Sequence, residues 1–488
     1  MTQKRDIALI NELLDGNFEN NCLEFKGNNQ DPKIIGKLCS ALSNSARIAG
    51  ENFAYVLWGI RNSDHKIIGT NFDPDKKINL HQVEKFKLAQ KLKPNIDYSF
   101  KTIDHPNGRV VILEIPATTL APVEFDGTAY VRIGSATPKL ADHTNKFQTL
   151  IKNLHIYTWE KEVAKSFLSA DEVLKLIDYP SYFKLTHQGL PDNKVVIFQH
   201  LESDELIMKD VGGKWNILNL GAILFATNLN KFPSSIARKG VRFVAYEGNN
   251  KATKVKYRID SSKGYAVGFK GLVTYINNLL PYNEDIGQVL RKKKLVFPEI
   301  AIRELIVNAL IHQDMTISGA GPQVELFKDR MEITNPGKSL VDIDRMIDLP
   351  PRSRNEGIAA LMRRMGFCEE QGSGLDKVID IVESYQLPAP MPTPKFQMNK
   401  DSMQVVLYAP RPFAKMSQDE RIRACFYHTV MKYLSGDKMK NSSLCKRFGI
   451  NKKNAAQVSK VIKKALNEKK IKVADKESPR AGYYPWWA

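Results

Sequence analysis

The stretch PEIAIRELIVNALIHQD, residues 298–314, is the most informative part of this 488-residue sequence for its fold and its function. Pro298 and Glu299 suit the first turn of a helix, where a missing N–H is harmless and a carboxylate meets the positive end of the helix dipole. Apolar residues then recur at helical spacing, which predicts a helix with one buried face. That face comprises Ile302, Leu305, Ile306, Ala309 and Leu310.

A polar stripe runs beside this apolar face. Glu304, Asn308 and His312 are spaced i, i+4, i+8, so they lie on one side of the helix. A glutamate can deprotonate a water molecule, and an asparagine can give an oxygen ligand to Mg²⁺. The stripe therefore predicts a chemical site.

Two glycine turns follow the helix. Asn335-Pro336-Gly337 ends a strand-like segment, and Gly372-Ser373-Gly374 opens a second helical pattern. A glycine turn at a helix N-terminus presents backbone N–H groups and the positive dipole end to a phosphate. The alternative is an ordinary helix cap without a ligand.

In this order the three motifs resemble the GHKL ATPase superfamily of gyrase, heat-shock chaperones, histidine kinases and mismatch-repair proteins. The resemblance implies ATP and Mg²⁺ as cofactors, with Glu304 as the water-activating base and Asn308 as the Mg²⁺ ligand. His312, Asn335, Gly337 and the 372–374 turn would complete the nucleotide site. The superfamily has an aspartate where this chain has Asn335, whose oxygen still accepts a hydrogen bond but carries no charge. The resemblance implies an ATPase, and binding without turnover stays open.

The N-terminal part carries three ordered motifs: LEFK at 23–26, LWGIRN at 57–62 and AYVRIGS at 129–135. Together they resemble the AlbA-like nucleic-acid-binding domain of the Schlafen family. The resemblance to some Schlafen relatives also implies a metal-dependent RNase whose active site contains three carboxylates. Glu19 and Glu24 match the first two of these in spacing. The third position holds no acid, and Asp64 is the nearest one.

Carboxylates that converge beside a lysine can hold Mg²⁺ and stabilise a phosphate under attack. Glu19, Glu24 and Lys26, with Asp64 as a further ligand, therefore form an alternative nuclease site acting on RNA or DNA. The other interpretation is that Glu24 and Lys26 form a surface ion pair on a strand. Arg132 is expected to contact nucleic acid.

Positive charge gathers at the C-terminus. The chain has 72 Lys and Arg against 53 Asp and Glu, a net charge of +19, which favours a polyanionic partner. Residues 416–488 hold 17 of these cations and six acids, a net charge of +11. Their pattern of helices, turn and wing is typical of a winged helix-turn-helix. A solvated basic face or a protein-binding winged helix is the alternative. The lysines expected to contact DNA are Lys452, Lys453, Lys460, Lys463 and Lys464.

The sequence thus predicts an α+β multidomain protein with an N-terminal AlbA-like α/β domain, a GHKL-like α/β sandwich and a C-terminal winged helix-turn-helix. The alternating prolines of LPAPMPTPK predict an extended connector, followed by a returning strand pair in 396–410. Strands are also expected at VVIFQH (195–200) and LNLGAILFA (218–226). The expected domains are 1–145 (Schlafen/AlbA-like), 146–295 (α/β connecting region), 296–410 (GHKL-like) and 416–488 (winged helix-turn-helix).

The remaining features exclude some classes of protein. The N-terminus lacks an apolar signal core, no apolar run reaches 18 residues, and five scattered cysteines suit a reducing compartment. We expect a cytoplasmic protein without a membrane partner. The predicted function is a nucleotide-responsive nucleic-acid-binding protein, on DNA rather than RNA, that regulates transcription or defends against foreign nucleic acid. A change of homo-oligomeric state is one way it could switch. The alternatives are the Schlafen-like nuclease and a non-catalytic interaction scaffold.

Overall fold

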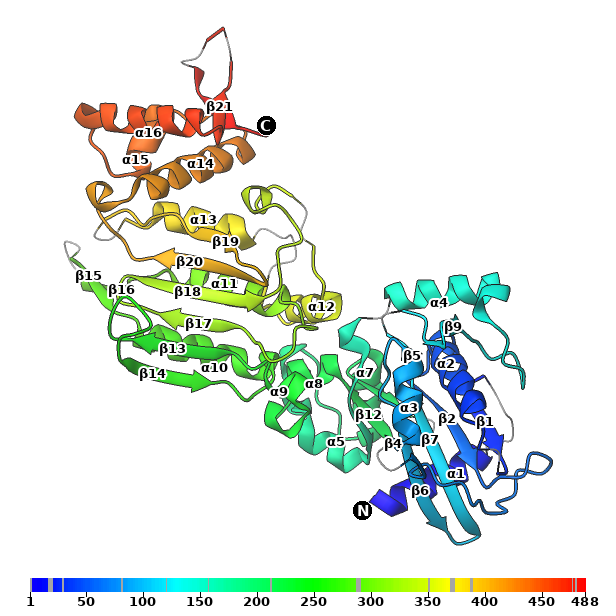
Figure 1. The fold of residues 1–488 in the computed structure, drawn as a ribbon. Helices are drawn as coiled ribbons and strands as arrows, with labels where there is room; N and C mark the ends of the chain where they lie inside the picture. The colour runs from blue at the N-terminus through cyan, green and yellow to red at the C-terminus, as the bar shows by residue number, and fades with distance from the viewer. Residues whose placement is uncertain are drawn as a thin grey trace. The chain divides into compact units, whose positions relative to one another are not determined.

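The structure is a computed structural model of the chain. It describes residues 2–15, 21–28, 30–79, 82–119, 121–156, 158–210, 213–286, 291–349, 352–368, 374–386, 389–475, 477–478 and 481–488. These residues form two compact units, residues 1–173 with 201–219 and residues 174–200 with 220–488 (Figure 1). The mixed helices and sheets confirm the predicted α+β multidomain class. The four domain boundaries stay a prediction.

The first unit is built on a four-stranded sheet in the order β1-β2-β7-β6, in which β1 and β2 are parallel. Its strands are β1 (Leu23–Lys26), β2 (Phe53–Trp58), β6 (Ser99–His105) and β7 (Gly108–Pro116). Both faces of this sheet are covered, one by α1 (Thr2–Asp15) and one by α2 (Pro32–Ala49). Side chains of β7 alternate accordingly: Val111 and Leu113 pack in the cluster of α2, and Val110 and Ile112 pack in the cluster of α1.

A polar row on α2 fixes the segment that follows β7. Asn44 is fully buried, and its side chain bonds the backbone of Val123 in both directions (3.0 and 2.8 Å) and the carbonyl of Tyr130 (2.9 Å). Ser40 donates to the Val123 carbonyl (2.6 Å), and Arg47 donates to that of Thr118 (2.6 Å). These bonds satisfy backbone groups of an irregular segment that would otherwise be buried without partners.

Short elements complete the first unit. They form the sheets β3-β4, β5-β8-β9 and β10-β12-β11 with three helices. Their bounds are β3 (Lys77–Asn79), β4 (Gln82–Val83), α3 (Glu84–Lys91), β5 (Leu92–Lys93), β8 (Glu124–Phe125), β9 (Thr128–Ala129), α4 (Thr144–Ile156), β10 (Val163–Leu168), α5 (Ala170–Leu176, at the boundary of the units), β11 (Ile207–Lys209) and β12 (Trp215–Leu218).

The second unit contains a six-stranded sheet in the order β14-β13-β17-β18-β20-β19. Only the β13–β17 pair is parallel, and the last hairpin confirms the strand pair predicted after the prolines. Helix α11 packs against β18, α10 and α13. The bounds are β13 (Arg242–Tyr246), β14 (Val255–Asp260), α10 (Tyr265–Leu279), α11 (Glu299–Ile311), β17 (Gln323–Leu326), β18 (Arg330–Pro336), α13 (Gly374–Ser384), β19 (Lys395–Met398) and β20 (Ser402–Tyr408).

Two predicted strands are wrong. VVIFQH lies in α7 (Lys194–Ser203), where Ile197, Phe198 and Leu201 form a buried face while Val195 is 63% exposed. LNLGAILFA lies largely in α8 (Asn219–Phe225), which is buried almost all round. The other described elements of this unit are α6 (Tyr179–Leu185), α9 (Ser234–Ala237), β15 (Tyr282–Ile286), β16 (Arg291–Leu295) and α12 (Glu356–Arg364).

The C-terminal region, residues 416–488, belongs to the second unit. It consists of α14 (Gln418–Leu434), α15 (Asn441–Arg447), α16 (Ala455–Asn467) and the hairpin of β21 (Ile471–Val473) and β22 (Tyr483–Pro485). Ser417 and Glu420 form a capping box that starts α14. Its assignment as a winged helix stays a prediction. Across the described chain, we find no helix with the length and apolarity needed to cross a membrane.

Candidate nucleotide pocket and charged sites

A cavity of about 460 Å³ opens beside α11. Glu304, Asn308 and His312 all line it, so the polar stripe faces one cavity as predicted. The opposite side of α11 is held in the core by Ile302, Ile306 and other buried residues. The helix therefore cannot rotate about its own axis, and its three polar residues stay on the side of the cavity.

Asn355 fixes the end of α11. Its buried side-chain nitrogen donates to the carbonyl of Ile311 (2.7 Å), the last residue of α11, and to that of Gln313 (2.8 Å), two residues further on. Carbonyls at a helix C-terminus lack partners within the helix, so this contact satisfies them from outside. Sequence reasoning missed Asn355, because nothing local links it to a helix more than 40 residues earlier.

Gly374, the first residue of α13, lies against the Glu304 carboxylate. A Cβ atom added at this glycine would come within 1.8 Å of Glu304 Oε1. A side chain at this position would therefore displace the Glu304 carboxylate. The N-terminus of α13 thus meets the cavity that Glu304 lines. Gly372 and Ser373 lie outside the described residues.

The first glycine turn borders the same cavity. Asn335 is 7% exposed, lines the cavity and donates its side-chain nitrogen to the Pro336 carbonyl (3.2 Å), so its oxygen is the atom left to accept a bond. Gly337 has φ +96°, and a Cβ there would lie 2.6 Å from the Cβ of Asp314. Both the positive φ and this close approach require glycine.

The described lining of the cavity combines cations with apolar side chains. Lys338, Arg352, Arg354 and Arg363 line it, against the acids Glu304 and Glu356. Ile333, Leu340, Val341, Met346, Leu349, Phe396, Met403 and Val405 supply the apolar part. An apolar surface with an excess of cations suits a ligand that has a flat ring system at one end and phosphates at the other.

His312 adds a polar group to the cavity. Burial lowers the pKa of His312, the Arg354 cation lowers it further, and a hydrogen bond with the Arg352 backbone acts in the opposite direction. The imidazole is therefore neutral near pH 7 and offers a hydrogen bond rather than a charge.

In the first unit, Glu24 forms a buried ion cluster. One carboxylate oxygen binds the Lys26 ammonium, and the other binds the Arg132 guanidinium, whose side chain is only 1% exposed. Arg132 also donates to the Ser135 carbonyl (2.9 Å) and to the Thr137 hydroxyl (3.0 Å). Both oxygens of Glu24 are thus engaged by cations, which favours a structural ion pair over a metal ligand. The burial of Arg132 leaves little of its side chain for the expected contact with nucleic acid.

Asp64, the further carboxylate of the alternative nuclease site, pairs with other cations than Glu24 does. Asp64 Oδ2 is 3.2 Å from Arg61 Nη1 and 3.8 Å from Lys66 Nζ, in an exposed turn. Glu19 lies outside the described residues. Within the described part of the chain, no three His, Cys, Asp or Glu side chains are grouped so that they could hold a metal ion.

The predicted DNA-contacting lysines are all exposed on or just before α16: Lys452, Lys453, Lys460, Lys463 and Lys464. A hollow of about 300 Å³ lies beside α14 and α16, and Arg421, Lys460 and Lys464 line it with Gln418 and Gln457. None of the described residues that line this hollow is acidic. Anions therefore meet a positive surface here.

Two family models match parts of the chain. Residues 19–141 match the model described as "Schlafen, AlbA_2", and residues 319–407 match an ATPase-domain model described as "Putative ATP-dependent DNA helicase recG C-terminal". These matches confirm the two resemblances that the motifs indicated. The second match includes Asn335, Gly337 and the 372–374 turn, and α11 precedes it. Together the matches support an ATP-dependent protein associated with nucleic acid.

The comparisons with curated proteins and with solved structures are less informative than the family models. No curated protein matches the chain. The solved structure of the DIP2311 protein from Corynebacterium diphtheriae is 16% identical, with a TM-score of 0.42. The alignment covers 94% of this chain and 93% of that one.

The contact between Gly374 and Glu304 predicts that two glycine-to-alanine substitutions differ in their effect on the stability of the second unit. Gly374→Ala should destabilise the second unit by about 1–3 kcal/mol, because the new methyl group overlaps Glu304. The control Gly271→Ala lies in α10 with no atom near the added Cβ, so it should be neutral or stabilise by up to about 1 kcal/mol. Calorimetric unfolding measures both. Equal effects would contradict the contact, and Glu304→Ala should restore part of the loss.

The Glu24 cluster predicts that Arg132 acts on stability. Arg132→Met leaves a buried carboxylate with one partner fewer and should destabilise the first unit by about 3 kcal/mol. Adding Glu24→Gln should recover much of that loss. Unfolding of the single and double variants measures the coupling. If Arg132→Met unfolds like the natural protein but no longer binds nucleic acid, Arg132 is a surface contact and the ion pair is unimportant.

Proposed function

We propose that this protein binds Mg-ATP in the cavity beside α11 and binds nucleic acid, DNA rather than RNA, as a regulator of transcription or of defence against foreign nucleic acid. One observation carries the proposal: the polar stripe of α11, the first glycine turn and the N-terminus of α13 meet around one cavity. A volume of about 460 Å³ falls within the range of ordinary ligand pockets.

The adenine ring would lie on the apolar side of this cavity. Asn335 is the buried polar group there, and its oxygen is oriented to accept a hydrogen bond because its nitrogen is bound to the Pro336 carbonyl. An acceptor at this position selects a base with an amino group, as adenine has. Since the amide is uncharged, we expect weaker selection than a carboxylate would give.

The phosphates would lie toward the cations and α13. Lys338, Arg352, Arg354 and the helix N-terminus all offer positive charge or N–H donors to them. Asn308 provides the carboxamide oxygen that suits Mg²⁺, which prefers one or two protein ligands beside phosphate oxygens and water. When bound, Mg²⁺ neutralises phosphate charge. Glu304 is the carboxylate placed to take a proton from water, so hydrolysis is proposed together with binding.

The nucleic acid would contact two regions. The AlbA_2-type domain is the first, and the exposed lysines of α16 with the basic hollow beside them are the second. Neutralising backbone phosphates releases counterions, so the affinity should fall steeply with salt. A protein-binding role for the C-terminal region would lack this steep dependence.

Asn308→Ala tests the nucleotide site. We expect its Mg-ATP affinity to fall about tenfold or more, because the variant lacks the oxygen ligand for the metal. Titration calorimetry with Mg-ATP measures this, with Asn230→Ala, an exposed asparagine of the same unit, as the control. Failure of the natural protein to bind Mg-ATP, or equal affinity in all three proteins, would contradict the proposed site.

Neutralising the lysines of α16 tests the nucleic-acid interface. The triple substitution Lys460→Gln, Lys463→Gln, Lys464→Gln should weaken DNA binding and reduce the slope of log affinity against log salt by about 2–3. A charge-matched control replaces the exposed Lys254, Lys256 and Lys328 by Gln. Equal losses in the two variants would show that only overall charge matters. No loss in the first variant would move the interface away from α16.

A further inference from the structure

Helix α13 connects the cavity to the C-terminal region. Its first residue, Gly374, lies against Glu304, and its last turn carries Glu383. Eleven helical residues span about 16 Å. Because α13 also packs along α11, it can move as one body but not bend freely.

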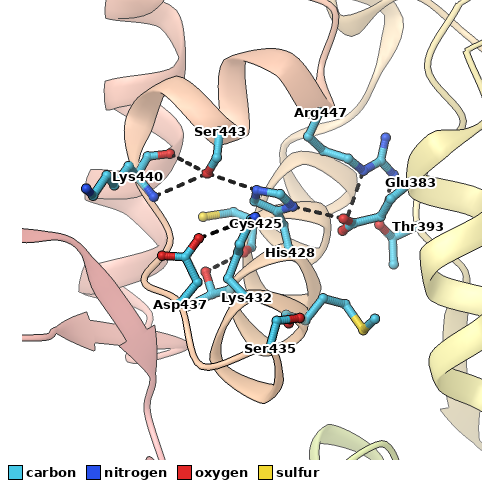
Figure 2. Close-up of polar contacts among 12 residues, drawn as sticks. Glu383, Thr393, Cys425, His428, Lys432, Ser435, Asp437, Lys440, Ser443 and Arg447 are labelled. Carbon is cyan, nitrogen blue, oxygen red and sulfur yellow. Dashed lines mark hydrogen bonds and ion pairs between the residues drawn. The ribbon is translucent and has the colours of Figure 1, made fainter. Parts of the chain in front are cut away.

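Glu383 enters a buried polar network at the far end (Figure 2). His428 Nδ1 on α14 lies 2.9 Å from its Oε2, and Arg447 Nε at the end of α15 lies 3.6 Å from its Oε1. The Arg447 side chain is 1% exposed and that of Glu383 is 13% exposed. A displaced Glu383 would leave Arg447 as an uncompensated buried charge, so the two must move together.

The network also joins the elements of the C-terminal region to each other. His428 Nε2 lies 3.0 Å from the Ser443 hydroxyl, which connects α14 to α15 (Figure 2). Arg447 donates to the carbonyl of Met391 (2.7 Å) and to the Thr393 hydroxyl (3.3 Å), both in the proline-rich connector. Burial and loss of hydration lower the pKa of Arg447, and the Glu383 carboxylate opposes this.

A second connection runs through the segment 338–349, which lines part of the cavity. Residues 338–349 supply six of its described lining side chains, among them Val341 and Met346. Between these two, Asp344 pairs with Lys470 beside β21 (2.6 Å), and the Arg345 guanidinium lies 4.6 Å from the ring centre of Trp487 after β22.

A third contact is direct. Phe396 on β19 lines the cavity, and its ring packs against that of the buried Tyr427 on α14, with centres 6.1 Å apart. Three separate walls of the cavity thus contact the C-terminal region. Close-packed contacts of this kind transmit displacement, because the interior has little free volume.

From these contacts we infer that α13 and the 338–349 segment transmit the occupancy of the cavity to the C-terminal region. The inference rests on the proposed binding of Mg-ATP. Phosphates at the N-terminus of α13 add negative charge beside Glu304 and attract the helix dipole, so they change the distance that Gly374 keeps from that carboxylate. Glu383 carries this shift to α14 and α15, and the 338–349 segment carries it to the β21–β22 hairpin. The lysines of α16 thereby take a nucleotide-dependent position.

Hydrogen exchange on the full chain tests this. Mg-ATP should slow exchange in α11, which reports binding, and should change exchange in 418–447 by about fivefold or more, the lower end of ordinary coupling. Glu383→Gln should keep the effect on α11 and lose the effect on 418–447. The control Asp380→Asn changes an exposed carboxylate on the same helix and should keep both effects.

A second variant covers the case in which Glu383→Gln disrupts folding. Asp344→Asn removes a half-exposed ion pair and should reduce the change at β21–β22 without unfolding the region. If Mg-ATP protects α11 but alters nothing in the C-terminal region, or alters it equally in every variant, the coupling is overturned while nucleotide binding stands. If α11 is not protected in the natural protein, both proposals fall.

Discussion

The close approach of Gly374 to the Glu304 carboxylate is the constraint on which the site of the second unit depends. The backbone that carries Glu304 is fixed, because the apolar face of α11 is buried and Asn355 holds the end of that helix. The start of α13 lies against this carboxylate, and the far end of the helix meets the C-terminal region at Glu383.

Much of this site could be predicted from local patterns in the sequence. The stripe of α11 was predictable because three polar residues at i, i+4, i+8 beside an apolar face have only one helical arrangement. The first glycine turn was predictable because its conformation disfavours other residues, as the φ of Gly337 shows. The strand pair after the prolines alternates in period two, which a helix does not.

Other features could not be predicted from local pattern. A short, wholly apolar run fits a buried helix as well as a buried strand, so Val195–His200 and the segment at 218–226 were assigned to the wrong element. The two buried ion pairs, Glu24 with Arg132 and Glu383 with Arg447, join residues 108 and 64 positions apart. No periodicity records such a pairing. Buried pairs of this kind add little net stability but penalise any arrangement that separates them.

The excess of positive charge in this chain is located at particular places in the structure. Positive side chains occur both around the cavity and on α16, and the described contacts connect these two places through α13 and residues 338–349. We propose that a nucleotide occupies this cavity. Cys368 is a free thiol that lines it, so the rate of its alkylation, followed by peptide mass spectrometry, reports occupancy directly. Mg-ATP should slow the alkylation of Cys368 several-fold while leaving that of Cys22 unchanged. An unchanged rate for Cys368 at saturating Mg-ATP would contradict the account.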